Sequence, residues 1–329
     1  MPAFGQVMVR VRRLALVAFA AWSLCGAAQA YPDGPVHIVV PFAPGGATDQ
    51  LARLLAEKLS PIMREQFVVE NKPGANTILA ATQIARGKPD GQTLFIAAGS
   101  TVILSPLLYK SLPFDPARDF NMLAVLGEMP LVLVVSVKNP IKTLPEFLDH
   151  ARNNAGKLNF GSPGTGSTLH MAGELLKQEA GISATHAPYK ISSQAMMDLM
   201  GGSLDFMMAD YPMAKPELAA DKIRPLAVTS HERLKPLPDI PALNEIYPGF
   251  LAIVWYGLVV QKATPEPIVR QIKAAVDQVL ADPSFVEGMT RIGFVSGRPM
   301  TLDAVQQYMA DETKRWSEVI TSRNIKIDP

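Results

Sequence analysis

The chain has 329 residues, of which 48% are hydrophobic and 19% are charged, and its mean hydropathy is +0.14. This composition excludes a disordered or fibrous protein, and the length suggests two domains. The net charge of +1, without a basic stripe, gives no indication of nucleic-acid binding.

The first thirty residues have the pattern of a secretory signal peptide. Three arginines precede an apolar run over 14–24, and Ala28-Gln29-Ala30 fits a small-x-small cleavage site. The apolar run is well short of the roughly 20 residues that a membrane-spanning helix needs. We therefore expect cleavage after Ala30. Residues 1–30 hold three Arg and no Lys, Asp or Glu, so 28 basic and 30 acidic residues would remain, a net charge of −2.

Cys25 is the only cysteine of the chain, and it lies within the predicted signal peptide. The mature protein would therefore have no disulfide, no thiol nucleophile and no thiolate metal ligand. Export without disulfides suggests a bacterial periplasmic protein.

The first element of the mature chain is a strand, a glycine turn and a helix in succession. Val36 to Val40 is mostly β-branched, as expected for a strand that is covered on both faces. Gly45 and Gly46 permit positive φ, and Thr48 and Asp49 are residue types that begin helices. The N–H groups at such a helix start and the helix dipole together form an anion site, although an ordinary βα turn has the same pattern.

The same alternation of strand and helix continues along the chain. The apolar stretch 122–137 is interrupted at Gly127 and Pro130 and predicts two strands, the second entering a second lobe near Ser136. Hydrophobic periodicity predicts further strands over 67–70, 93–98, 158–160, 187–190, 204–208, 223–229 and 255–260, and helices over 77–86, 102–109, 143–153, 169–181, 193–199, 267–280, 283–289 and 302–320.

A second strand, glycine turn and helix begins at Leu158. The turn, 161–168, carries Gly164, Gly166, Ser167 and Thr168 ahead of the helix. It repeats the arrangement of the first unit, so the two turns are candidates to meet on one ligand between two lobes. His170 lies in the first turn of the helix and either binds the ligand or closes the turn.

Signatures of other protein classes are missing from the sequence. The turn at 164–169 has two of the three glycines of a dinucleotide fingerprint, with Leu169 in the third place, and there is no phosphate loop or nucleophile elbow. Ser167, His170 and Asp205 are the residue types of a Ser–His–Asp set, but Ser167 and His170 lie too close on one helix for its face-to-face geometry. The histidines are scattered. We therefore expect no enzyme activity, no cofactor and no bound metal.

Seven segments together resemble one family. They are VVPFAPGGATD (39–49), ENKPGA (70–75), PDG (89–91), GSPGTGSTLH (161–170), HAPYK (186–190), GGSLD (201–205) and LPDIP (237–241). Over residues 31–329 the chain resembles the Bug (Bordetella uptake gene) substrate-binding proteins, which are periplasmic solute receptors of tripartite tricarboxylate transporters.

This resemblance implies an α/β, two-lobed periplasmic-binding-protein fold of the second type, with two crossovers between the lobes. Lobe 1 would comprise 31–135 and 252–329, and lobe 2 would comprise 136–251. A ligand carboxylate would be held by backbone N–H groups of the two glycine turns. The residues expected at the ligand are Phe42, Gly45, Gly46, Ala47, Thr48, Asp49, Ser100, Thr101, Gly164, Gly166, Ser167, Thr168, His170, Tyr189, Ser192, Ser193, Asp205 and Asp210.

The chain departs from the family where a glycine-rich run usually follows Lys190. Here the residues are Ile191, Ser192, Ser193 and Gln194. They either face the distal end of the ligand and alter specificity or only cap a helix. Similarly, Trp255 and Tyr256 either line the cleft or pack beneath the last helices.

The sequence thus predicts a monomeric periplasmic receptor that captures a small organic carboxylate and delivers it to the membrane permease of a tripartite tricarboxylate transporter. A ligand sensor for a two-component system is an alternative that the sequence does not separate from transport. A periplasmic carboxylate-ester hydrolase is an alternative of another class, which turnover lost on Ser167→Ala would favour.

Overall fold

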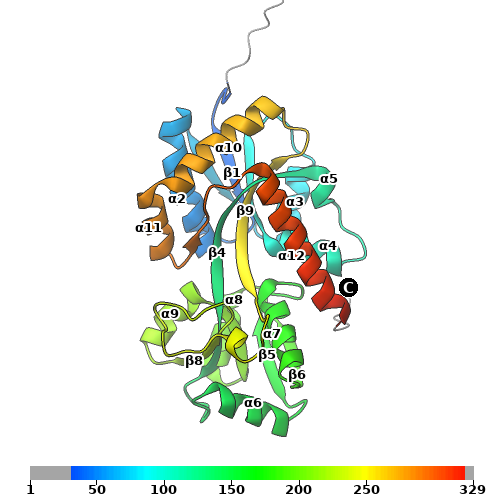
Figure 1. Ribbon diagram of the computed structural model, residues 1–329, viewed down its shortest axis with the longest axis vertical. Helices are drawn as coiled ribbons and strands as arrows, with labels where there is room; N and C mark the ends of the chain where they lie inside the picture. The colour runs from blue at the N-terminus through cyan, green and yellow to red at the C-terminus, as the bar shows by residue number, and fades with distance from the viewer. Residues whose placement is uncertain (1–30, 323–329) are drawn as a thin grey trace, which may run out of the picture. The chain divides into compact units, whose positions relative to one another are not determined.

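The computed structural model describes residues 31–322, so the predicted signal peptide lies outside the described residues. The chain divides into two units, Met1–Gly34 and Pro35–Pro329. All described helices and strands belong to the second unit (Figure 1).

The first sheet is built around β1 (Val36–Val40), whose hydrophobic residues are buried. It pairs in parallel with β2 (Phe67–Asn71) and β3 (Thr93–Ala98). Next to β3 lies antiparallel β9 (Ile253–Gln261), followed by the first part of β4 (Phe120–Ser136) and short β10 (Val295–Ser296). This sheet and its helices are called lobe 1. The helices of lobe 1 are α2 (Ala47–Met63), η1 (Ala75–Thr77), α3 (Ile78–Ala85), η2 (Ser100–Leu104), α4 (Ser105–Leu108), α5 (Pro116–Asp119), α10 (Glu266–Ala281), α11 (Pro283–Arg291) and α12 (Leu302–Ser322).

The second sheet contains the remainder of β4 together with strands from the middle of the chain. β4 pairs antiparallel with β7 (Phe206–Asp210) and β8 (Ile223–Val228), and β5 (Leu158–Ser162) pairs in parallel with β7 and with β6 (Ala184–Pro188). This sheet and its helices are called lobe 2. The helices of lobe 2 are α6 (Leu144–Asn153), α7 (Thr168–Glu179), α8 (Ser192–Gly201), α9 (Tyr211–Ala219) and η3 (Leu243–Glu245).

A single strand joins the two sheets, so the prediction of two strands over 122–137 is wrong. β4 runs unbroken for 17 residues, pairs with β9 as far as Pro130 and pairs with β7 from Leu131. Gly127 is accommodated by a register shift against β9. Pro130 cannot donate a backbone hydrogen bond, and it lies at the point of β4 where pairing with β9 ends and pairing with β7 begins.

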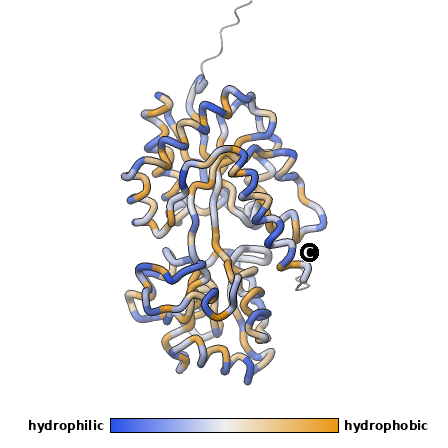
Figure 2. Tube along the Cα trace, viewed as in Figure 1, coloured by the Kyte–Doolittle hydropathy of each residue, from blue (hydrophilic) through white to orange (hydrophobic). Residues whose placement is uncertain are grey.

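The segment between β8 and β9 forms the second crossover. Thr229 of this segment is hydrogen-bonded to β4, which is the first crossover. Its Oγ1 accepts from Leu131 N of β4 at 3.1 Å and donates to Ala252 O of the second crossover at 2.6 Å. Figure 1 shows β4 and β9 side by side between the lobes, and Figure 2 shows hydrophobic residues along β9 and hydrophilic residues along much of α12.

The structure therefore has the two-lobed α/β fold of periplasmic binding proteins. The predicted lobe limits at 135/136 and 251/252 stay a prediction. The helix expected over 102–109 is a π-helical turn, η2, followed by the single turn of α4. In the described part of the chain, no helix combines the length and the apolar character needed to span a membrane.

Candidate functional site

A cavity of about 820 Å³ is lined by residues of both lobes. Helical segments of both lobes begin at its wall, among them α2, η1 and η2 from lobe 1 and α7, α8 and α9 from lobe 2. Since the first N–H groups of a helix have no partner within it, such starts are the places where a protein offers backbone donors to a ligand.

The start of α2 is open to the cavity. Gly46 is its N-cap, makes no side-chain cap, and lines the cavity together with Ala47 and Thr48. The helix therefore begins before Thr48 and Asp49, the residues expected to cap it. Gly45 has φ +84°, which justifies glycine there, whereas Gly46 has φ −74°.

Asp49 supports this turn from behind and does not line the cavity. Its Oδ2 accepts from Gly45 N at 3.0 Å, and Arg53 Nε and Nη2 donate to its carboxylate at 2.9 and 3.1 Å. Burial alone would raise the pKa of Asp49, but the bonds from Arg53 and Gly45 hold it below its ordinary value. The carboxylate is thus paired with Arg53, which limits its repulsion of an anion bound at the helix start.

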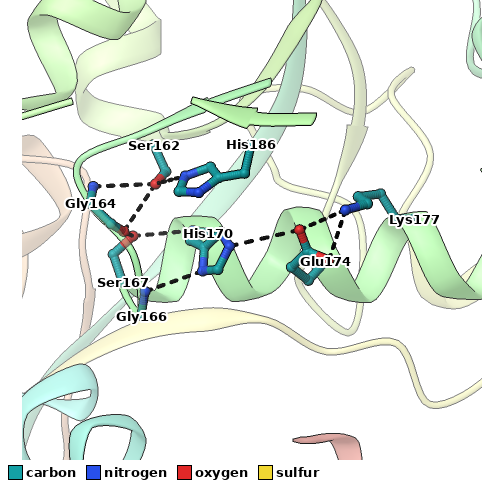
Figure 3. Close-up of polar contacts among 8 residues, drawn as sticks. All are labelled: Ser162, Gly164, Gly166, Ser167, His170, Glu174, Lys177 and His186. Carbon is teal, nitrogen blue, oxygen red and sulfur yellow. Dashed lines mark hydrogen bonds and ion pairs between the residues drawn. The ribbon is translucent and has the colours of Figure 1, made fainter. Parts of the chain in front are cut away.

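The second glycine turn is closed by its own hydrogen bonds (Figure 3). Gly164 and Gly166 have φ +135° and +80°. Gly164 N donates to Ser162 Oγ at 3.2 Å, and Gly166 N donates to His170 Nδ1 at 3.2 Å. Gly164 O accepts from Ser162 Oγ at 3.0 Å and from Ser167 Oγ at 2.8 Å. The N–H groups of these two glycines are therefore used inside the turn.

Two neutral histidines hold this turn in place. The rings of His170 and His186 lie 3.9 Å apart, and His186 Nε2 lies 2.7 Å from Ser162 Oγ. Burial, followed by the charges of His186 and Lys177, lowers the pKa of His170 to about 3, and burial followed by Lys177 lowers that of His186 to about 4. Uncharged His170 accepts the Gly166 N–H, so it closes the turn and does not line the cavity.

Three further helix starts of lobe 2 reach the cavity. Ser167 caps α7 by accepting from His170 N at 3.2 Å, and Asp210 caps α9 by accepting from Met213 N at 3.1 Å. Ile191 precedes α8 and has no side chain able to cap it, so Ser192 and Ser193 begin α8 at the cavity wall without a side-chain cap.

The charged residues of the lining favour an anion. They are Lys190, Lys215 and Arg291 against one carboxylate, that of Asp210. Burial raises the pKa of Asp210, although backbone bonds oppose the shift. Arg291 lies 3.6 Å from Glu287, and both side chains are largely exposed.

The structure brings together many, but not all, of the residues expected at the ligand. Those that line the cavity are Phe42, Gly45, Gly46, Ala47, Thr48, Ser100, Ser167, Thr168, Ser192, Ser193 and Asp210. Those that do not are Asp49, Thr101, Gly164, Gly166, His170, Tyr189 and Asp205.

The residues outside the lining have partners within the protein. Thr101 Oγ1 lies 2.7 Å from Thr77 Oγ1. Tyr189 OH donates to Asp198 at 2.7 Å, and Asp205 accepts from Asn159 N at 2.7 Å. The imidazole of His170 accepts from Gly166 N and the carboxylate of Asp205 accepts from Asn159 N, so Ser167, His170 and Asp205 do not form a Ser–His–Asp set.

The sequence reasoning missed several lining residues, among them Asn76, Met129, Met213, Lys215 and Arg291. Of these, only Asn76 directly follows one of the recognised segments, and no motif marks the others. For Trp255 and Tyr256 the two alternatives divide between the residues. Tyr256 lines the cavity, and its ring centroid lies 5.9 Å from that of Phe42. Trp255 is buried and donates to Glu312 at 3.0 Å. Burial raises the pKa of Tyr256.

The fold and the interlobe cavity define a periplasmic binding protein, and comparisons with known proteins name its family. The model of the tripartite tricarboxylate transporter family receptor matches residues 51–325. The chain is 33% identical to a UPF0065 protein of the tcbD-tcbE intergenic region of Pseudomonas sp. (strain P51), over 94% of each chain. It is 29% identical to the protein BugT of Bordetella pertussis, over 91% of this chain and 92% of BugT.

Two solved structures are similar over most of the chain. One is Rpa4515 of R. palustris with adipate (TM-score 0.84, 32% identity, 90% of this chain and 99% of that one). The other is MatC (Rpa3494) of Rhodopseudomonas palustris with bound malate (TM-score 0.80, 32% identity, 88% of this chain and 100% of that one). The chain belongs to the tripartite tricarboxylate transporter receptor family, and the predicted resemblance to Bug proteins is confirmed.

Proposed function

We propose that this protein is a periplasmic receptor that binds a small organic carboxylate in the interlobe cavity and delivers it to the permease of a tripartite tricarboxylate transporter. One observation carries the proposal: the starts of α2 in lobe 1 and of α8 in lobe 2, both without a side-chain cap, open onto the same cavity. The two related receptors bind adipate and malate, which are both dicarboxylates.

The donors at these helix starts are sufficient for physiological affinity. A hydrogen bond to a charged group contributes about 1.5–3 kcal/mol. Four strong bonds of this kind, after binding costs of about 4 kcal/mol, give a dissociation constant near the micromolar range. Lys190 and Lys215 add long-range attraction for an anion from the side of lobe 2.

We place the specificity for the distal end of the ligand at α8. Ser192 and Ser193 line the cavity, whereas Gln194 does not. Because Ile191 occupies the N-cap position, the two serines are not that helix's N-cap. A Ser192/Ser193→Gly double variant should therefore alter which carboxylates bind. An unchanged ligand profile would overturn this assignment.

The test of the proposed function is a thermal-shift and calorimetry panel that includes adipate, malate and the uncharged diamide of adipic acid. A carboxylate present at 100 times its dissociation constant should add about 2.7 kcal/mol to the free energy of unfolding, and the diamide should add none. No response to any carboxylate of the panel would contradict the proposal. The bound ligand should be recovered unchanged, because we propose a non-catalytic monomer.

A further inference from the structure

A strained segment of lobe 1 lies at the edge of the cavity. Ala75, Asn76 and Thr77 have φ of +46°, +48° and +74°, three successive non-glycine residues in the left-handed region. Asn tolerates this region because its side chain is short and polar, whereas a β-branched residue such as Thr77 is rarely found there. The surrounding structure must therefore hold the segment in this conformation.

The side chains of Thr77 and Asn76, two residues of this strained segment, have specific partners. Thr77 Oγ1 lies 2.7 Å from Thr101 Oγ1, and both residues are buried in lobe 1. Asn76 Nδ2 donates to Thr165 O at 3.4 Å. The first contact anchors the segment to its own lobe, and the second reaches the other lobe.

The acceptor of Asn76 belongs to the closed glycine turn of lobe 2. Thr165 lies between Gly164 and Gly166, the two residues whose N–H groups are bound by Ser162 and His170 (Figure 3). The turn is thereby held against β6 and α7, so the Thr165 carbonyl moves with lobe 2 as a whole. The bond from Asn76 consequently joins the two lobes across the cavity and not through the crossovers.

We propose that Asn76 is a positioning residue that latches the lobes together over the ligand, with its amide bonded to the Thr165 carbonyl in the closed state. The proposal rests on the proposed function, since a receptor must close on its ligand and later release it. The rigid, strained backbone presents the amide at a fixed place, so little freedom is lost when the bond forms.

Two substitutions separate the amide bond from the backbone. Asn76→Asp keeps a residue that tolerates positive φ but replaces the donor with a carboxylate oxygen, which faces a carbonyl. Asn76→Gly removes the side chain and also relaxes the backbone. Both should raise the dissociation rate of adipate, about 2- to 10-fold for the loss of one neutral hydrogen bond. Asn76→Gly should leave the association rate nearly unchanged, whereas Asn76→Asp also adds a negative charge to the cavity lining and should slow the association of the anion. Arg64→Gly is the control, because it relaxes a positive-φ residue (φ +56°) outside the cavity.

A second measurement does not depend on ligand. Spin labels on Leu79→Cys in α3 and Met197→Cys in α8 of the mature chain, which is expected to lack Cys25, report the distance between the lobes, since both native side chains are more than half exposed. Asn76→Asp and Asn76→Gly should shift the distances toward longer values even without adipate, while the thermal midpoint of unfolding changes little.

The outcomes of the two measurements are distinct. If Asn76→Asp behaves as the wild type while Asn76→Gly does not, the change in dissociation rate and distance comes from the backbone and not from the amide bond, and the latch is overturned. It is also overturned if neither variant changes the distances or the dissociation rate. If no carboxylate binds but both variants still lengthen the distances, the proposed function fails and the latch stands.

Discussion

At the scale of single residues, the pair His170 and His186 shows how a ligand-binding turn is kept rigid without exposing its groups to the ligand. The two rings lie 3.9 Å apart at an interplanar angle of 35°, His170 is buried and accepts from Gly166, and His186 lies within hydrogen-bond distance of Ser162. Neutral imidazole is required for this, because a protonated His170 could no longer accept the Gly166 N–H.

Because of the histidine pair, the free energy of unfolding should decrease as the pH is lowered below about 6.5. The unfolded chain takes up these protons near pH 6.5, whereas the folded chain does so only near 4 and 3. The unfolded state thus binds more protons in this window, so the stabilisation is fully present above 6.5 and is lost as pH falls toward 4. Each histidine contributes a slope of about 1.4 kcal/mol per pH unit.

The variant His170→Asn isolates one of the two contributions. Its amide oxygen replaces Nδ1 as the acceptor, so the slope measured by urea unfolding between pH 6 and 4.5 should fall by about 1.4 kcal/mol per pH unit. His231→Asn, at an exposed position, is the control and should keep the wild-type slope. Equal slopes for His170→Asn and the wild type would rule out a depressed pKa for His170.

This pair also marks a limit of what the sequence reveals. The position of His170 in the first turn of its helix gave two alternatives, ligand binding or closure of the turn, and the structure shows the second. His186 lies on another strand, and it meets Phe160 and His170 only because β5 and β6 pair with Phe160 opposite His186. Strand register of this kind is not encoded in any local pattern.

At the scale of elements, the start of α2 depends on two adjacent glycines with different requirements. Gly45 needs its positive φ, whereas Gly46 has an ordinary φ. A Cβ added at Gly46 would meet only Ala43 O, at an ordinary contact distance of 3.7 Å. The β-branched strand and the Gly-Gly turn were sufficient to predict this unit. The residue at which α2 begins was not predicted, because Asp49 acts from its third position by reaching back to Gly45.

The two glycines should therefore respond differently to alanine. Gly45→Ala should lower the free energy of unfolding by about 1 kcal/mol, because an L-residue is strained at that φ. Gly46→Ala should leave the free energy of unfolding nearly unchanged, since a Cβ has room there, and should weaken adipate binding, because it adds a methyl group to a residue of the cavity wall at the start of α2. Urea unfolding and calorimetry measure the two effects. Equal affinities for Gly46→Ala and the wild type would place the anion elsewhere.

At the scale of the whole described unit, α12 ties together the two strands that run between the lobes. Tyr308 OH donates to Glu128 of β4 at 3.3 Å, Trp255 Nε1 of β9 donates to Glu312 at 3.0 Å, and Arg315 donates to the carbonyl of Leu251 just before β9. Burial, followed by the charge of Glu312, raises the pKa of Glu128, against the bond from Tyr308. The sequence predicted α12 from its periodicity but not this role, since the partners lie 57 to 180 residues away.

Glu312 is the centre of this contact, so Glu312→Ala should be costly. The substitution leaves the buried indole N–H of Trp255 without its acceptor and removes the carboxylate that Arg315 contacts at 2.5 Å. An unsatisfied buried donor costs about 1–3 kcal/mol, and urea unfolding should show a loss of that size. Glu318→Ala, at an exposed position of the same helix, should change the free energy of unfolding by less than about 0.5 kcal/mol.

The same substitution separates support of the crossovers from support of lobe 1 alone. Because Glu312 and Arg315 contact β9 and the segment before it, Glu312→Ala should also broaden the distances between the labels on the two lobes. If the free energy of unfolding falls but the distances stay as in the wild type, α12 stabilises lobe 1 without restraining the crossovers. If neither changes, the bond from Trp255 to Glu312 contributes nothing to the folded state.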